Sequence, residues 1–242
     1  MNILVLQSCS VRQLGSPWLQ TCLQSVASWA QQSDFHYRFI GDELFSVVPE
    51  WYMTKVQTKL PVATDYARLI YLQRALGEGF EQVIWLDADV LVFDQALTLE
   101  FTDSCAFGQE FWVQKHNGKL VARSNLHNAV CVFKKNCVVL PFLIQTIASL
   151  VQRVDPAHLA PQFVGPKLLT ALHSLCNFSL LPQVGALSPL VVADICAGSG
   201  VALDLLRQQS QVSPLAVNLC ASLIGEVAAS AVVAFLLTKG SL

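Results

Sequence analysis

The sequence predicts an α/β fold, with a mixed but mostly parallel sheet flanked by helices and a helical region at the C-terminal end. Three observations support this prediction. Short apolar runs typical of buried strands alternate with amphipathic helical patterns along the N-terminal half. Hydrophobic residues make up 53% of the 242 residues, which is enough for a large core. Since no Pro- or Gly-rich linker interrupts the chain, we expect one domain over residues 1–242.

The first elements predict a strand–helix–strand unit. Residues 2–7 form an apolar run, which indicates a buried strand that ends at Gln7 and Ser8. Residues 17–31 carry apolar side chains at helical spacing, and residues 35–40 indicate a second strand. Because a helix separates the two strands, we expect them to pair in parallel.

A helix is predicted over residues 63–76, with Thr64 or Asp65 as its cap and Gly77 as its stop signal. Asp65 and Arg68 lie three positions apart, so they share one face of this helix. The simplest interpretation of the pair is a local surface ion pair, worth only a few tenths of a kcal/mol.

Two carboxylates interrupt the apolar run over residues 83–93, at the motif Asp87-Ala88-Asp89. The run predicts a strand buried on both faces, and in a continuous strand Asp87 and Asp89 would point to the same side. Two oxygen donors at a strand's end favour a hard cation such as Mg²⁺ or Mn²⁺. The alternative is a turn in which the carboxylates accept hydrogen bonds from backbone N–H groups.

The remaining elements are less regular. We expect strands over residues 105–113 and 129–134, with a turn at Asn117-Gly118, then helices over 142–154 and 168–175 and a short strand over 178–181. The apolar stretch over residues 215–237 is long enough to span a membrane, but Glu226 lies at its midpoint. We therefore expect buried terminal helices, with peripheral membrane contact left open.

Two of these motifs together carry a family resemblance. Thr64-Asp65-Tyr66-Ala67-Arg68, followed by Trp85-Leu86-Asp87-Ala88-Asp89, resembles the nucleotide-sugar site of DXD glycosyltransferases of the GT-A fold. The group it resembles has a sugar-binding region containing the DXD motif and includes the initiating mannosyltransferases and the large clostridial toxins. The strand motif is also similar to the glycogenin-like family. The resemblance implies a nucleotide-sugar-binding half over residues 1–112, and an acceptor side with C-terminal helices over 113–242.

The resemblance also implies roles for particular residues. Asp65 and Arg68 would hold the nucleotide sugar and serve as the catalytic pair, while Asp87 and Asp89 would hold Mn²⁺ or Mg²⁺ against the diphosphate. Further contacts would come from the strand end and from later segments: Gln7 and Ser8 toward the base, His127 and Asn128 toward the acceptor, and Asn218 as an oxygen ligand to the metal. A helix cap is the alternative role for Asn218.

The implied function is a metal-dependent, retaining transfer of sugar from a UDP- or GDP-sugar to a glycan, lipid or protein acceptor. Front-face displacement in the named relatives requires no protein nucleophile, and we assign none. One alternative is a binding protein of the same fold without activity. Another is an S-adenosylmethionine methyltransferase, because residues 194–200 resemble its Gly-rich loop. Only 42 residues follow Gly200, however, too few for the rest of such a sheet.

Charge and cysteine content narrow the cellular setting. The net charge of −2 does not favour nucleic-acid binding. The eight cysteines form no C-x-x-C pair, which favours reduced thiols over a disulfide frame or zinc site. We therefore expect a cytoplasmic protein, with membrane association as a further option.

Overall fold

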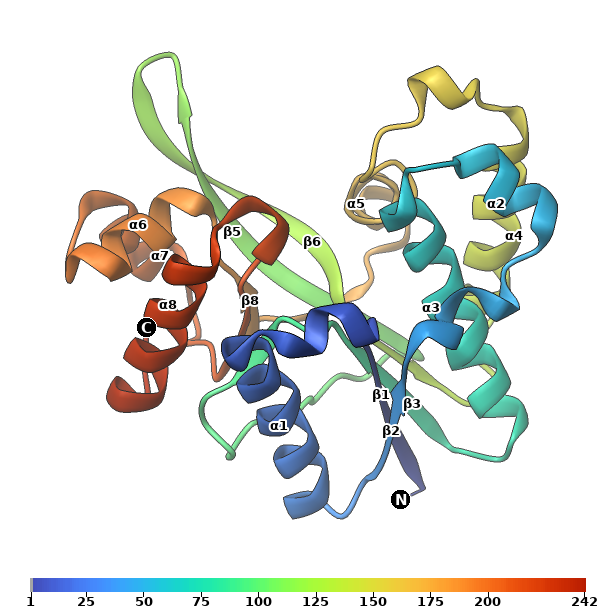
Figure 1. Cartoon of the computed structure of the whole chain (residues 1–242), viewed down its shortest axis with the longest axis horizontal. Helices are drawn as coiled ribbons and strands as arrows, with labels where there is room; N and C mark the ends of the chain where they lie inside the picture. The colour runs from blue at the N-terminus through green and yellow to red at the C-terminus, as the bar shows by residue number, and fades with distance from the viewer. Residues whose placement is uncertain (1) are drawn as a thin grey trace.

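The computed structural model describes residues 2–242 and has the predicted α/β architecture (Figure 1). The larger sheet is formed by β1 (Ile3–Ser8), β2 (His36–Ile40), β3 (Gln82–Leu86), β5 (Cys105–His116), β6 (Lys119–Lys134) and β7 (Ser179–Leu181), in the order β2-β1-β3-β6-β5-β7. Pairing is parallel for β2–β1, β1–β3 and β5–β7, and antiparallel for β3–β6 and β6–β5. The prediction of a mixed, mostly parallel sheet is confirmed.

A smaller sheet corrects the prediction of one strand over residues 83–93. Strand β3 ends at Leu86, and β4 (Val90–Val92) pairs instead with β9 (Ala216–Asn218), which in turn pairs with β8 (Val184–Ala186). Between β3 and β4 the chain turns, and the Val90 N–H donates to the Asp87 carbonyl over 3.0 Å. The Asp87-Ala88-Asp89 motif is therefore a turn through which the chain passes from one sheet to the other.

One face of the larger sheet is covered by α2 (Glu50–Val56), α3 (Leu60–Gly77), α4 (Val139–Arg153) and α5 (Pro166–Cys176). Because strand side chains alternate, Leu4, Leu6, Val83 and Trp85 point toward these helices. Helix α3 begins earlier than predicted, so Thr64 and Asp65 lie inside it and neither residue is its cap.

The opposite face packs on α1 (Pro17–Gln32), where Val26 and Trp29 meet Val5 and Ile84 of the sheet. Helices α6 (Pro189–Ala197), α7 (Val201–Gln209) and α8 (Glu226–Lys239) share a second core with α1, on the left side of Figure 1. The predicted C-terminal helical region is confirmed. The midpoint carboxylate Glu226 begins α8 and accepts a hydrogen bond from the Trp18 indole N–H over 2.6 Å.

Across the described residues 2–242, no single helix is long and apolar enough to cross a membrane. By length and composition alone, the bent pair α6 and α7 passes the same test, with an angle of 116° between its helices.

Strands β5 and β6 form a long hairpin whose tip projects beyond the helices (Figure 1). Its turn is the predicted Asn117-Gly118, with φ angles of 50° and 75°, as a two-residue hairpin turn requires. Near its base the register jumps: Phe107 pairs with Cys131, but the next residue, Gly108, pairs with His127. Residues 128–130 therefore form a bulge in β6, which redirects side chains out of the regular ladder.

Candidate functional site

The site is built around a buried guanidinium on helix α3. Arg68 is 4% exposed, and its Nη2 lies 3.2 Å from Oδ1 of Asp65, which is 7% exposed. Its Nη1 lies 3.2 Å from Oδ1 of Asp87 and donates to the carbonyl of Asn128. One side chain thus links α3 to the β3–β4 turn and to the bulge in β6. The interpretation of Asp65 and Arg68 as a surface ion pair is wrong, because both side chains are buried.

Burial sets the electrostatics of this cluster. It raises the pKa of Asp65 to about 6, although Arg68 and Asn128 favour the charged form and oppose the shift. Burial alone would lower the pKa of Arg68, but Asp87 and Asp65 outweigh it and raise the pKa, so the guanidinium is charged. It also lies 5.4 Å from the centre of the Trp85 ring, within cation–π range.

The two carboxylates of the turn have different partners. Asp87 Oδ1 accepts from the Trp85 indole over 2.7 Å, and its side chain is 26% exposed. Asp89 Oδ1 accepts from the Asn218 amide nitrogen over 2.7 Å, and its Oδ2 accepts from the Ala221 N–H over 2.9 Å. Burial, and after it the charge of Asp87, raises the pKa of Asp89. A cation between these carboxylates would relieve that repulsion.

Asn218 lies beside Asp89, but it presents its nitrogen to the carboxylate. Its amide oxygen accepts from the Cys220 N–H over 2.9 Å and from the Cys220 thiol over 3.0 Å. In this arrangement Asn218 positions Asp89, and its role as an oxygen ligand to a metal stays a prediction. Within residues 2–242, no group of three or more His, Cys, Asp or Glu side chains is placed to hold a metal ion.

The two residues at the end of β1 have different surroundings: Gln7 supports the β3–β4 turn, and Ser8 lines a cavity. Gln7 is fully buried; its amide nitrogen donates to the Asp87 carbonyl over 3.2 Å, and its oxygen accepts from the Tyr37 hydroxyl over 3.0 Å. Gln7 therefore holds the turn through its side chain, and its contact with a nucleotide base stays a prediction. Ser8, one residue on, lines an open cavity.

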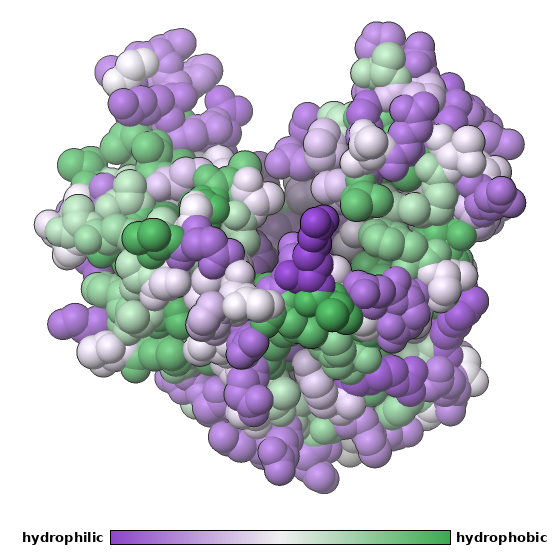
Figure 2. Space-filling view, viewed as in Figure 1, coloured by the Kyte–Doolittle hydropathy of each residue, from purple (hydrophilic) through white to green (hydrophobic). Residues whose placement is uncertain are grey.

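Large cavities adjoin at the turn. One of about 460 Å³ is lined by Ser8, Asp42 and Arg68 among others, and one of about 390 Å³ extends from Ser8 and Arg68 to Asp87 and Asp89. On the other side, a cavity of about 720 Å³ (the hairpin cavity) runs from the same two carboxylates along the hairpin to α5. Figure 2 shows the surface hollowed between the α2–α5 side and the α6–α8 side. Such a place, at the carboxyl ends of the parallel strands β1 and β3, is where α/β folds bind ligands.

The two residues predicted on the acceptor side, His127 and Asn128, lie at the bulge in β6. Asn128 donates from its amide nitrogen to Oδ1 of Asp65 over 2.7 Å. His127 lies against Gly108, where a Cβ atom would come within 2.1 Å of its Nε2. Burial lowers the pKa of His127 to about 4, so the ring is neutral at pH 7 and its Nε2–H donates to the Val184 carbonyl over 2.9 Å. Both residues line the hairpin cavity.

Sequence reasoning missed the lining residues of the hairpin itself, above all Glu110, Trp112 and Asn125. Burial raises the pKa of Glu110 to about 7, although the hydrogen bond from Asn125 opposes the shift. A signal was present, because the Asn117-Gly118 turn fixes the register and so places Glu110 opposite Asn125.

The Gly-rich segment over residues 194–200 comprises the last turn of α6 and the link to α7, so it joins two helices rather than a strand and a helix. Asp194 Oδ2 accepts from the backbone N–H groups of Ala202 and Leu203 over 2.7 and 3.1 Å, which caps the start of α7. A Cβ atom at Gly200 would come within 2.1 Å of the Asp194 carboxyl group. The glycine therefore makes room for a cap, and the resemblance to a methyltransferase loop does not extend to its structure.

The sheet order, the flanking helices and the position of the site define a fold of the GT-A glycosyltransferase type. The chain is similar to the solved structure of a glycosyltransferase involved in the glycosylation of the major capsid of PBCV-1, with a TM-score of 0.55 and 13% identity over 97% of this chain and 100% of that chain. It is also similar to the apo form of the glycosyltransferase GlyE of Streptococcus pneumoniae TIGR4, with a TM-score of 0.50 and 12% identity over 91% of this chain and 55% of that chain. At these identities the likeness establishes the fold. No protein-family model and no curated protein matches the chain.

Proposed function

We propose that this protein is a glycosyltransferase that moves a sugar from a nucleotide-diphosphate donor, a UDP- or GDP-sugar, to a hydroxyl of a glycan, lipid or protein acceptor. One observation carries the proposal: Arg68 and the Asp87–Asp89 turn meet where large cavities adjoin, at the carboxyl ends of β1 and β3. The donor would occupy the cavities lined by Ser8 and Arg68, and the acceptor would occupy the hairpin cavity, lined by His127 and Asn128.

A divalent ion, Mn²⁺ or Mg²⁺, fits the chemistry of the turn. Two carboxylates with repelling charges line the same cavities, and Asp87 is open to them. With only these two acidic ligands, we expect the ion to bind weakly until the donor's diphosphate supplies further oxygens. When bound, the ion would neutralise the charge that develops on the diphosphate leaving group.

The protein's own contribution to transfer is positioning and charge. Arg68 is fixed by Asp65 and Asp87, so its planar group is already oriented and can donate to oxygens of the diphosphate or the sugar. Asp65 orients Arg68 and can accept from a sugar hydroxyl, and Asn128 holds Asp65 in place. We infer a retaining, front-face course with no protein nucleophile from the resemblance of the sequence motifs alone.

One observation favours a second candidate, a binding protein of the same fold that does not catalyse transfer. The Arg68 guanidinium already neutralises Asp87, and Asn218 presents a nitrogen to Asp89. Both contacts lower the demand for a metal at the turn. Donor turnover separates the candidates, since a binding protein would bind UDP or GDP without hydrolysing or transferring the sugar.

The test is calorimetry with UDP and GDP, each with and without Mn²⁺, followed by an assay of nucleotide-sugar hydrolysis. We expect tight nucleotide binding only with Mn²⁺, and its loss in the double variant Asp87→Ala, Asp89→Ala. The exposed Glu100→Ala serves as a control for removal of an acidic side chain. Equal affinity for UDP and Mn²⁺ in the wild type and the double variant would exclude the proposed metal site.

A further inference from the structure

One face of the β5–β6 hairpin forms a wall of the hairpin cavity. The register pairs Gly108 with His127, Glu110 with Asn125 and Trp112 with Arg123. Because side chains alternate along a strand, these positions share one face. Glu110, Trp112, Asn125 and His127 all line the cavity of about 720 Å³, which is within the usual size range of ligand sites.

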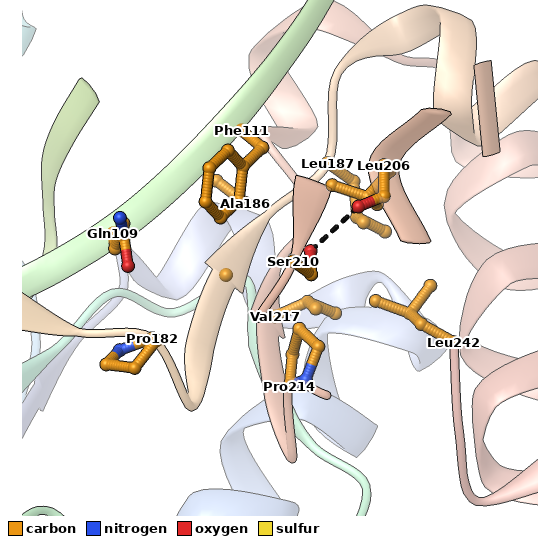
Figure 3. A pocket seen from close by; sticks show the side chains of 11 residues that line it. Gln109, Phe111, Pro182, Ala186, Leu187, Leu206, Ser210, Pro214, Val217 and Leu242 are labelled. Carbon is orange, nitrogen blue, oxygen red and sulfur yellow. Dashed lines mark hydrogen bonds between the residues drawn. The ribbon is translucent and has the colours of Figure 1, made fainter. Parts of the chain in front are cut away.

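On the opposite face of the hairpin, the cavity beside Gln109 and Phe111 is small. Gln109 and Phe111 point there, into a cavity of about 10 Å³ that also touches Leu206 and Ser210 (Figure 3). That volume holds about one water molecule. A ligand that uses the hairpin therefore meets the face with Glu110 and Trp112.

Polar groups on the cavity face are partly buried and only partly paired. Glu110 accepts from the Asn125 amide over 3.2 Å. His127 is 4% exposed, and its Nδ1 has no hydrogen-bond partner among residues 2–242. Since Nε2 carries the proton of the neutral ring, Nδ1 is an acceptor. Because Nδ1 is itself buried, the groups of this face that a ligand can reach are those of the half-buried Glu110, Trp112 and Asn125.

The charges that line the cavity narrow the class of ligand. Asp87, Asp89 and Glu110 supply carboxylates, and among the described lining residues Lys167 is the one cation. Since Arg68 pairs with Asp87, the acidic groups without an ion-pair partner are Asp89 and Glu110, and these disfavour acceptors that carry phosphate or carboxylate groups. The half-buried Trp112 adds a flat apolar surface with an indole N–H at its edge. An aromatic plane beside hydrogen-bonding groups suits a sugar ring, which has apolar C–H faces and a rim of hydroxyls.

We propose that this face of the hairpin is an acceptor subsite for a neutral oligosaccharide, in which Trp112 packs against a sugar ring and Glu110 and Asn125 bind its hydroxyl groups. That the bound sugar is an acceptor rests on the proposed glycosyltransferase function, whereas the binding of a sugar at this face does not depend on that function. Glu110 acts here as a specificity-determining residue. At pH 8, where the anionic probes are compared, its carboxylate repels an anionic ligand, and it can accept hydrogen bonds from a neutral one in either protonation state.

The test is saturation-transfer NMR on the full chain with free mono-, di- and trisaccharides as probes. Lactose, maltose, cellobiose and chitobiose are the neutral probes, and sialyllactose and glucose 6-phosphate are the anionic ones. The variants are Trp112→Ala, Trp112→Phe and Glu110→Gln. Lys115→Ala is the matched control, since it is exposed on the same strand and at a position of the other face. Melting temperatures verify that each variant folds.

We expect at least one neutral disaccharide to bind and the anionic sugars to bind more weakly or not at all. Trp112→Ala should weaken binding about tenfold, which corresponds to the loss of about 1.4 kcal/mol of aromatic contact. Trp112→Phe should retain part of the affinity, Glu110→Gln should weaken it, and Lys115→Ala should match the wild type. If Trp112→Ala does not fold, the affinities of Trp112→Phe and Glu110→Gln test the inference instead.

Two results would overturn the inference: no binding of any neutral probe, or undiminished binding in both Glu110→Gln and the Trp112 variant that folds. Calorimetry with UDP and with GDP, each in the presence of Mn²⁺, tests the donor site separately. Disaccharide binding without binding of either nucleotide would refute the proposed function and leave the sugar site standing, whereas nucleotide binding without disaccharide binding would do the reverse.

Discussion

The amide nitrogen of Asn128 donates to Oδ1 of Asp65 over 2.7 Å, and this bond ties the bulge of β6 to helix α3. The carbonyl of Asn128 accepts from Arg68, so the same residue holds both members of the buried ion pair. The bulge is what allows this, because a regular strand would keep the Asn128 backbone within the ladder with β5.

Substitution of Asn128 by Ala should therefore destabilise the fold. The buried Asp65 would lose a donor while its charge stays inside the protein, which costs about 1–3 kcal/mol. Urea unfolding of Asn128→Ala measures the cost, with Ser124→Ala, an exposed change on the same strand, as the control. Equal midpoints for Asn128→Ala and the wild type would show that the bond contributes nothing to stability.

Gly108→Ala should disturb His127. The new Cβ atom would come within 2.1 Å of Nε2 and 2.2 Å of Cε1, so the ring must leave its place against the Val184 carbonyl. Overpacking of this kind costs about 1–3 kcal/mol. Thermal unfolding tests it against Gly15→Ala, where nothing lies within 4 Å of the added atom. An unchanged melting temperature in Gly108→Ala would mean that His127 has room to move.

Glu110 should make the protein less stable as the pH rises. Burial raises its pKa from 4.5 to about 7, so between these values the folded state binds more protons than the unfolded state. The free energy of unfolding then falls with rising pH over this window, by an amount on the order of a few kcal/mol. Glu110→Gln removes this contribution, so its stability relative to the wild type should increase between about pH 5 and pH 8. Denaturant unfolding at several pH values measures the difference, and a constant difference would contradict the shifted pKa.

Much of the fold was predictable because its signals are local. The apolar runs of β1 and β3, the helical spacing in α1 and the Asn117-Gly118 turn each depend on neighbouring residues, and each was found where expected. A turn at Asp87-Ala88-Asp89 was the alternative to a continuous strand, and the structure has that turn, but the change from one sheet to the other was not predicted. The residues on both sides of the turn are apolar and buried, so the sequence pattern is the same in β3 and β4. The change of sheet is seen only in the pairing of β4 with the distant β9.

The sequence motifs named the side chains that lie together around Arg68, but not the contacts between them. The motifs indicated Asp65, Arg68, Asp87 and Asp89, but spacing along a helix could not show that Arg68 is buried. That burial depends on Asn128, which reaches α3 through a bulge with no sequence signal of its own. Likewise Gln7 ends an apolar strand as a polar residue, and only the tertiary structure shows its amide under the turn.

Arg68→Lys tests whether the guanidinium is a functional group of the site. Arg68 uses Nη1 toward Asp87 and Asn128 and Nη2 toward Asp65, and its plane lies over Trp85. A lysine keeps the charge but has a single ammonium group, which cannot reproduce this planar fork. Because the pair is buried, Arg68→Ala would leave Asp65 unpaired at a cost of about 3–5 kcal/mol, so loss of activity in that variant would be uninformative.

Arg68→Lys should lose some stability, because a single ammonium cannot serve Asp65, Asp87 and the Asn128 carbonyl together, but it should still fold. We expect its turnover of the nucleotide sugar to fall far more than its melting temperature predicts. The comparison is with Arg38→Lys, which changes an exposed arginine that pairs with Glu78 on the surface. Hydrolysis or transfer assays, run beside thermal unfolding, give both quantities for each variant. If Arg68→Lys turned over the donor as fast as the wild type, the fork geometry of Arg68 would be structural only. The Asp87–Asp89 turn alone would then support the proposed function.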